Sequence, residues 1–454
     1  MAQDPSTPES PSPAADAGAE ALSRALAELG ARAGEADVHA DLGRERALME
    51  VLGDPQDAAP VAHLAGTNGK TSTARMVDAL VRAAGLTTGL YTSPHLHSPA
   101  ERIAVNGTAI SGERFAELYA EVAPYAALVD AAAGPLTWFE FVTGMAFAAF
   151  ADAPVDAMVV EAGMGGSWDA TNVVTPSVCT VTPIGIDHAR YLGTTIAEVA
   201  AHKAGIITAA VPVVSAVQDP AAAEVLRARA AEVGATLRIA DRDFRVVGSD
   251  VAVGGQLLDI EGVYGSYADI FLPLHGRHMA ANAALAVATA EEFLGGRALD
   301  PELVVEGLGD VGSPGRLEVL RRSPTVVADG AHNPMGMRSL VASLPEAFPF
   351  GRVIAVVAVL ADKDAGAMLA ELREIADRIV VTSNSSPRAM PTAELAELAR
   401  LHWDDEAVDV CPDIFEALDV AIELADADMA SMAGVVVTGS LTTVADARML
   451  LGRE

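Results

Sequence analysis

One stretch decides the fold of this chain: Ala65-Gly66-Thr67-Asn68-Gly69-Lys70-Thr71-Ser72. It follows an apolar run at 61–64 and precedes a helical pattern that ends at Gly85. This order of strand, glycine loop and helix is typical of a phosphate site, where backbone N–H groups face the anion, a lysine adds charge and a threonine hydroxyl can reach Mg²⁺. The usual pattern has a further glycine at the position of Leu64, so the loop is a shortened variant. The alternative, a glycine turn with a surface lysine, accounts less well for the flanking strand and helix.

Length and composition indicate a globular protein with an aliphatic core. A chain of 454 residues predicts two domains, with three as the alternative. Hydrophobic residues make up 51% and aromatic residues only 4%, so Ala, Val and Leu must fill the cores. The net charge of −32 argues against non-specific binding to nucleic acids or anionic membranes. An anionic substrate must therefore be met by local positive groups or by bound metal.

Cysteine usage and hydropathy favour a cytoplasmic protein. Cys179 and Cys411 are too few for a disulfide framework or a zinc cluster, as expected in a reducing compartment. No apolar run has the length of a membrane span, and the N-terminus lacks the basic and apolar regions of a signal peptide.

Three segments are expected along the chain. Residues 1–18 are rich in Pro, Ser, Ala and acidic residues, which predicts a disordered tail. Residues 19–311 alternate apolar runs with helical stretches, and the continuous apolarity of these runs favours a parallel sheet covered on both faces. Residues 312–454 follow a linker candidate at 311–316 and repeat this pattern, so a doubly wound Rossmann-like domain is expected there. The fold class is therefore α/β, with a small antiparallel insert at 241–273.

Apolar periodicity places the individual elements. The predicted strands span 155–160, 177–182 and 211–217 in the first domain and 325–328, 353–360, 379–382 and 435–438 in the second. The predicted helices include 19–33, 112–128, 143–150, 195–205 and 279–293.

Several polar residues stand where the first domain should bind a nucleotide. Glu161 ends an apolar strand, the position of a Mg²⁺ ligand in a nucleotide-binding α/β fold, and glycines at 163–166 allow close backbone approach. His188 follows another strand. Taken singly, Glu161 could equally be a solvated carboxylate, and an interior histidine is more often structural. Together with the loop they predict a metal and phosphate cluster. Lys203 lies in an apolar setting, where a lysine either snorkels or has altered chemistry.

Polar turns follow three strands of the second half, at 328–334, 360–364 and 438–440. Strand C-termini form the ligand-binding rim of open α/β sheets, so these turns and Arg316 predict a second part of the site. The aromatic segment 137–140 could stack on a flat ring, although the residues alone favour a core role.

These residues resemble the folylpolyglutamate synthase/dihydrofolate synthase family of the Mur ligase superfamily over nearly the whole chain from about residue 19. The segments that carry the resemblance are 41–43, 66–71, 93–96, 137–140, 161–166, 169–172, 187–188, 203–206, 315–316, 329–334 and 362–364. The resemblance implies a P-loop-type central domain with a mainly parallel sheet, followed by a Rossmann-like ligase domain.

The resemblance also implies cofactors and residue roles. The cofactors are ATP and two Mg²⁺ ions, with a monovalent cation as an optional addition. The implied ATP-binding residues are Asn68, Gly69, Lys70, Thr71, Asn282, Arg316 and Asp329. The implied metal ligands are Ser93 and Glu161 for one ion and His188 for the other, which a carbamylated Lys203 assists. The implied catalytic residues are Lys70, Lys203, His188 and His332.

The implied pterin site is the part with a clear departure from the family pattern. Ser167 replaces the arginine of the Gly-Gly-Arg-x-Asp stretch, which removes a fixed cation; Met279 and Ala358 are further departures. The implied pterin-binding residues are Asp41, Leu42, Gly43, Thr137, Trp138, Phe139, Glu140, Trp168 and Asp169.

The function implied is ATP-dependent ligation of L-glutamate to dihydropteroate, a reduced folate or both, through an acyl phosphate. We expect a monomer with small-molecule substrates and with no nucleic-acid or membrane partner. A Mur-type ligase for a peptidoglycan nucleotide precursor is one alternative, and segments 41–43 and 137–140 argue against it. A nucleotide-binding regulator without turnover is another, and the presence of Glu161, His188 and Lys203 argues against that.

Overall fold

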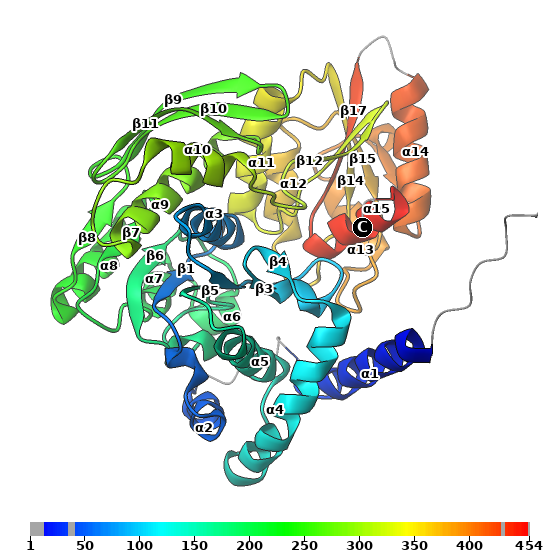
Figure 1. The fold of residues 1–454 in the computed structure, drawn as a ribbon. Coiled ribbons are helices and arrows are strands. Elements are labelled where there is room, and N and C mark those ends of the chain that lie inside the picture. Colours follow the sequence, from blue (N-terminus) through cyan, green and yellow to red (C-terminus); the bar gives the residue numbers. More distant parts are fainter. Residues whose placement is uncertain (1–12, 35–40, 428–431, 453–454) are drawn as a thin grey trace, which may run out of the picture.

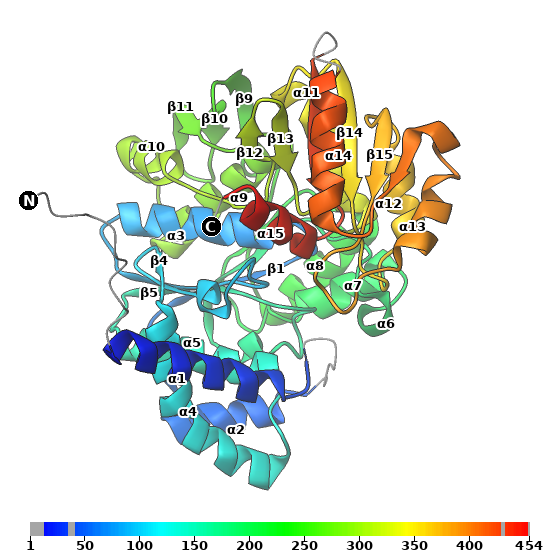
Figure 2. The ribbon, with the colours of Figure 1, turned by 90° about the vertical axis from the view of Figure 1, so that its right-hand side faces the viewer.

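The part of the chain that the structure describes folds into two mainly parallel sheets flanked by helices and one small antiparallel sheet (Figures 1 and 2). The computed structural model describes residues 13–34, 41–427 and 432–452. Within these ranges none of the helices combines the length and the apolarity needed to cross a membrane.

The glycine loop leaves the interior of an eight-stranded sheet with the order β4-β3-β2-β5-β1-β6-β7-β8. Strand β1 (Val61–Ala65) pairs in parallel with β5 (Ala157–Glu161) and β6 (Pro176–Val181). Every residue of β1 and β5 is buried, which confirms the prediction of a sheet covered on both faces. The other strands are β2 (Thr88–Tyr91), β3 (Ile103–Val105), β4 (Thr108–Ala109), β7 (Val213–Ser215) and β8 (Leu237–Ile239), of which β3 and β4 are antiparallel.

Helices cover both faces of this sheet because successive strand residues point to opposite sides. Ala62 and Leu64 pack into one core and Val61 into another. The helices on the first face are α3 (Lys70–Ala83), α9 (Arg277–Phe293) and α10 (Pro301–Gly309). Those on the second are α2 (Gly43–Leu52), α4 (Gly112–Ala133), α5 (Trp138–Asp152), α7 (Ile196–Ala204) and α8 (Pro220–Val233).

The second half forms a six-stranded sheet with the order β12-β13-β17-β14-β15-β16 and helices on both faces, as predicted for a doubly wound domain. Only the edge strand β12 runs antiparallel to its neighbour. The strands are β12 (Glu318–Arg322), β13 (Thr325–Ala328), β14 (Arg352–Val357), β15 (Arg378–Val381), β16 (Val408–Val410) and β17 (Ala433–Thr438). The helices are α11 (Pro334–Ala347), α12 (Ala365–Leu372), α13 (Thr392–Ala399), α14 (Ile414–Ala427) and α15 (Leu441–Leu450).

The predicted antiparallel insert is also confirmed. It consists of β9 (Arg245–Ala252), β10 (Gly255–Glu261) and β11 (Ser266–Leu272), with β10 in the middle. The insert packs against α9 and α10, on the same side of the large sheet as α3 (Figure 1).

Several predicted boundaries are wrong, those of three helices by about five residues; one of these helices, α4, ends at Ala133 instead of 128. Helix α1 (Pro13–Gly30) begins within the segment that was expected to be a disordered tail, because its alanines favour a helix and proline is tolerated in the first turn. Residues 1–12 of that predicted tail lie outside the described residues. Helix α5 begins at Trp138 instead of 143, because Thr137 and Glu140 form a capping box in which each side chain accepts a backbone N–H of the other residue.

Candidate active site

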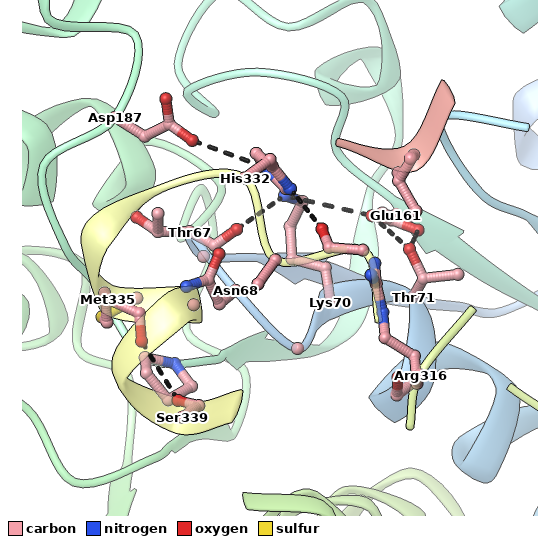
Figure 3. A pocket seen from close by; sticks show the side chains of 18 of the residues that line it. Thr67, Asn68, Lys70, Thr71, Glu161, Asp187, Arg316, His332, Met335 and Ser339 are labelled. Atoms are coloured by element: carbon pink, nitrogen blue, oxygen red, sulfur yellow. Dashed lines mark hydrogen bonds and ion pairs between the residues drawn. The ribbon is translucent and has the colours of Figure 1, made fainter. Parts of the chain in front are cut away.

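A cavity of about 200 Å³ lies between the two α/β sheets, at the C-terminal ends of their strands (Figure 3). Both halves of the chain line it, and it gathers residues that are far apart in the sequence. The predicted residues at this cavity are Asn68, Gly69, Lys70, Thr71, Ser93, Glu161, His188, Lys203, Asn282, Arg316, Asp329 and His332.

The loop conformation requires glycine at two positions. Gly66 has φ of 151°, and a Cβ there would lie 1.8 Å from Thr182 Oγ1. Gly69 has φ of 83°, and a Cβ there would lie 2.8 Å from Asn282 Oδ1. Helix α3 begins at the next residue, Lys70, so its N-terminus faces the cavity. Leu64, where the longer pattern has glycine, remains a buried residue of β1.

Glu161 is the centre of an oxygen-rich cluster on the floor of the cavity. Thr71 Oγ1 donates to Glu161 Oε2 at 2.9 Å, the Ser93 N–H donates to the same oxygen at 3.2 Å, and Lys70 Nζ lies 4.0 Å from Glu161 Oε1 (Figure 3). Burial raises the pKa of Glu161, although the charge of Lys70 opposes this shift. The Glu161 carboxylate and the Thr71 hydroxyl fit Mg²⁺, which prefers oxygen ligands and completes its shell with phosphates and water. Ser93, which also lines the cavity, carries a further hydroxyl. Within the described ranges, no three His, Cys or acidic side chains form a group that could hold a metal ion.

Lys203 is buried in the first half of the site. Lys203 belongs to helix α7, and its Nζ donates a hydrogen bond to the Gly66 carbonyl at 2.5 Å. Burial, reinforced by the charge of Lys70, lowers the pKa of Lys203 to about 7. The pKa of His188 is lowered to about 4, chiefly by burial. The apolar surroundings of Lys203 in the sequence allowed two interpretations, a snorkelling side chain or one with altered chemistry. The buried Nζ and the lowered pKa of Lys203 favour altered chemistry.

Asp187 connects the two halves of the chain. Lys363 Nζ lies 2.5 Å from Asp187 Oδ1, and Asn333 Nδ2 donates to Asp187 Oδ2 at 2.9 Å. Asn333 also exchanges two amide hydrogen bonds of 3.0 Å with Asn68 of the phosphate loop. Burial alone would raise the pKa of Asp187, but the charge of Lys363 outweighs it and holds this pKa well below its usual range. The sequence analysis identified the segments that contain Asp187, Asn333 and Lys363, but it did not predict that these residues contact one another.

The rim of the second half forms as predicted. Strands β13, β17 and β14 are neighbours, so the turns that follow them lie together. Asp329 organises the first turn, where its carboxylate accepts the N–H groups of Leu317 and Ala331 at 3.0 and 2.9 Å. His332 follows, and burial lowers its pKa to about 4, so its ring is neutral near pH 7.

The segments of the implied pterin site converge beside this cavity, under the second face of the large sheet. Arg44, next to Gly43, donates to Glu140 at 2.9 Å and so connects segment 41–43 with segment 137–140. Phe139 packs against Gly163, where a Cβ would lie 2.5 Å from the ring. Trp168 Nε1 donates to His202 Nδ1 at 3.1 Å. Trp138 and Phe139 border an apolar core, as the residues alone suggested.

Comparisons with known proteins agree with this geometry. The Mur ligase middle domain matches residues 137–290, and the glutamate ligase domain of Mur ligases matches residues 315–441. Fold and site thus define a Mur ligase. The chain belongs to the dihydrofolate synthase/folylpolyglutamate synthase family. It is 47% identical to the Mycobacterium tuberculosis dihydrofolate synthase/folylpolyglutamate synthase over 92% of each chain, and 34% identical to that of Bacillus subtilis over 90% of this chain and 94% of the relative.

Solved structures give the same result. The Mycobacterium tuberculosis folylpolyglutamate synthase complexed with ADP has a TM-score of 0.93 and 45% identity, covering 96% of this chain and 99% of the other. A folylpolyglutamate synthase–AMPPCP–folate complex has a TM-score of 0.80 and 30% identity, covering 95% and 99%.

Proposed function

We propose that this protein is an ATP-dependent ligase that joins L-glutamate to the carboxylate of a folate-type acceptor, with release of ADP and phosphate. The observation that carries the proposal is the shared cavity: the phosphate loop and Glu161 face Arg316, Asp329 and His332 from the other half of the chain. The relatives that bind ADP, AMPPCP and folate support ATP and a folate as substrates.

The reaction needs activation because an ionised carboxylate has no good leaving group. The acceptor carboxylate attacks the γ-phosphorus of ATP, the bond to the β–γ bridging oxygen breaks, and ADP and an acyl phosphate form. The glutamate amine then attacks the acyl carbon, and the tetrahedral intermediate expels phosphate while the nitrogen loses a proton. Lys70 and the loop N–H groups stabilise the phosphoryl charge. Mg²⁺ held by Glu161, Ser93 and Thr71 would offset further phosphate charge.

Carbamylation of Lys203 is the first testable consequence. A neutral lysine amine adds CO₂ and releases a proton, which gives a carboxylate-like group in the cavity that His188 also lines, where the two would hold the second Mg²⁺. Because burial lowers the pKa of Lys203 to about 7, the carbamate should increase as the pH rises through this value. We expect a ¹³C carbamate signal in ¹³C-bicarbonate that grows between about pH 6 and pH 8 and is absent from Lys203→Arg, whose guanidinium stays protonated. A wild-type spectrum identical to that of the variant would contradict carbamylation.

The acceptor is tested by glutamate-dependent phosphate release with dihydropteroate, tetrahydrofolate or a peptidoglycan nucleotide precursor. We expect release with one or both pteridine acceptors and none with the nucleotide precursor, because Asp169, Trp168 and the segments 41–43 and 137–140 form the proposed pterin site. Release only with the nucleotide precursor would contradict the proposal, and ATP binding without any release would indicate a regulator.

The remaining parts of the proposal concern the domains, the oligomeric state and the cellular location of the enzyme. We propose that residues 19–311 and 312–454 are separate domains that close on the nucleotide, which excludes water from the acyl phosphate. The proposed enzyme is a cytoplasmic monomer that acts on small molecules and binds neither nucleic acid nor membrane.

A further inference from the structure

An asparagine at the start of α11 holds the phosphate loop from the other half of the chain. Asn333 Nδ2 donates to Asn68 Oδ1 and Asn68 Nδ2 donates to Asn333 Oδ1, both at 3.0 Å, although the two residues are 265 positions apart. Asn333 Nδ2 also donates to Asp187 Oδ2 at 2.9 Å, and its Oδ1 accepts the Gly336 N–H at 2.8 Å. Both hydrogens and both lone pairs of this buried amide are therefore in use.

The chemistry of the partners fixes the orientation of both amides. A backbone N–H only donates, so the atom of Asn333 that meets the Gly336 N–H must be the oxygen. The other atom is then the NH₂ group, and its partner in Asn68 must be the oxygen of that residue. A flipped Asn333 amide would set its oxygen against the Asp187 carboxylate. The pair thus has one arrangement, in which Asn68 cannot turn away without breaking two hydrogen bonds.

The loop is supported from two sides. At its base, Thr67 Oγ1 donates to the Gly185 carbonyl at 2.9 Å and accepts the Gly185 N–H at 3.0 Å, and both residues belong to the first half of the chain. Asn68, the next residue, lies at the cavity beside the first turn of α11 (Figure 3). Among the described residues, its side-chain amide has hydrogen bonds with Asn333 alone. The side chain of Asn68 therefore takes its support from the second half.

Capping of α11 does not by itself explain an asparagine at this position. An N-cap needs only a side-chain oxygen, and serine or aspartate serves as well as asparagine. Helices α12 and α15, which follow strands β14 and β17 of the same sheet, are capped in this way by Asp364 and Ser440. What asparagine adds at 333 is the NH₂ group, and its two hydrogens reach Asn68 and Asp187 of the first half.

We propose that Asn333 is a positioning residue for ATP, which acts through Asn68 to hold the phosphate loop in the conformation that receives the phosphates. The loop is then fully supported only while the two halves of the chain are in contact. Nucleotide binding and this contact are therefore mutually dependent, because whatever stabilises one of them stabilises the other. The inference rests on the ATP-binding part of the proposed function, since it assumes that the loop at 66–72 binds the phosphates.

The test compares kcat/KM for ATP in variants of the full-length enzyme. Asn333→Ser keeps an oxygen that can cap α11 but cannot reach Asn68, and we expect kcat/KM for ATP to fall about thirtyfold, the loss typical of two neutral hydrogen bonds. Asn333→Asp also keeps the cap, but it loses both donors and places a carboxylate beside Asp187, so a fall of about a hundredfold is expected. A residue that only caps α11 would tolerate both changes.

A double-mutant cycle measures whether Asn333 acts through Asn68. Asn68→Ala should by itself lower kcat/KM for ATP about thirtyfold, because it removes the same two hydrogen bonds. In Asn68→Ala/Asn333→Ser the value should stay within about threefold of that in either single variant, since the pair is already lost. Independent roles would instead multiply the two losses to about a thousandfold, and that result would overturn the inference.

Asp413→Ser is the matched control. Asp413 lies on the surface of the second half and caps α14, where its Oδ1 accepts the Glu416 N–H at 2.9 Å. This replacement of a capping residue by serine should leave kcat/KM for ATP within about twofold of wild type. Melting temperatures are measured for all variants, so that a loss of activity is compared only between folded proteins.

Folded Asn333→Ser with kcat/KM for ATP within about twofold of wild type would also contradict the inference. If Asn333→Asp does not fold, Asn333→Ser and the cycle decide. A wild type without glutamate-dependent phosphate release would instead contradict the proposed function. The role of Asn333 is then decided by calorimetric titration with ADP, whose dissociation constant should rise about tenfold in Asn333→Ser and not in Asp413→Ser. Equal ADP binding by wild type and Asn333→Ser would exclude that role.

Discussion

Replacing Lys70 with methionine should lower kcat for glutamate ligation by about 10²–10³-fold, the loss typical of removing one preorganised charge-stabilising group. Lys70 is the first residue of α3, and its Nζ lies 3.4 Å from the Thr67 carbonyl and 4.0 Å from Glu161 Oε1. Its charge therefore lies within the loop that we propose to hold the phosphates of ATP. Methionine keeps most of the apolar stem, so the local packing should persist while the charge is lost.

The experiment measures steady-state ligation together with the melting temperature. Arg338→Met is the control, because Arg338 is a surface cation with 65% of its side chain exposed and pairs with Glu371. The control should keep full activity, whereas Lys70→Met should be folded and nearly inactive. Lys70→Met with kcat within a factor of three of wild type would exclude Lys70 from phosphoryl transfer, since loss of a charge there costs about 3 kcal/mol or more.

The first half of this site could be predicted because its signals are local. The loop at 65–72 specifies its own strand, turn and helix, and Glu161 is found by its place at the end of an apolar strand. The rim of the second half was also predictable, since strand C-termini of a parallel sheet share one edge. Each of these inferences needs only a short stretch and a general rule of α/β folds.

Contacts between distant segments could not be predicted in the same way. Asp187 and Lys363 are 176 residues apart, and no local pattern pairs them. Glu140 shows a different difficulty, because its segment supports two interpretations. The spacing of Thr137 and Glu140 matches a capping box, which predicts the start of α5. The aromatic residues between them instead indicate ring stacking or core packing.

Replacing Arg316 with alanine should lower kcat about a hundredfold while the protein stays folded. Arg316 precedes β12, next to Gly330 of the rim, and belongs to the proposed C-terminal domain. Its charge nevertheless acts across the cavity, because it favours the ionised form of Glu161 in the first half of the chain. Arg316 therefore lies across the cavity from the phosphate loop, where the proposed closure would bring its charge onto the phosphates of ATP.

Loss of closure should have a signature beyond slow turnover. If water reaches the acyl phosphate, phosphate release should exceed amide formation in Arg316→Ala, whereas the two should be equal in wild type. Arg316→Lys should recover part of the rate, because the charge returns without the planar fork of guanidinium donors. Arg388→Ala is the control, since Arg388 lies on the same domain, with 48% of its side chain exposed, and pairs with Asp362. Unchanged turnover in Arg316→Ala, with phosphate and amide still equal, would show that the two halves need not close through this residue.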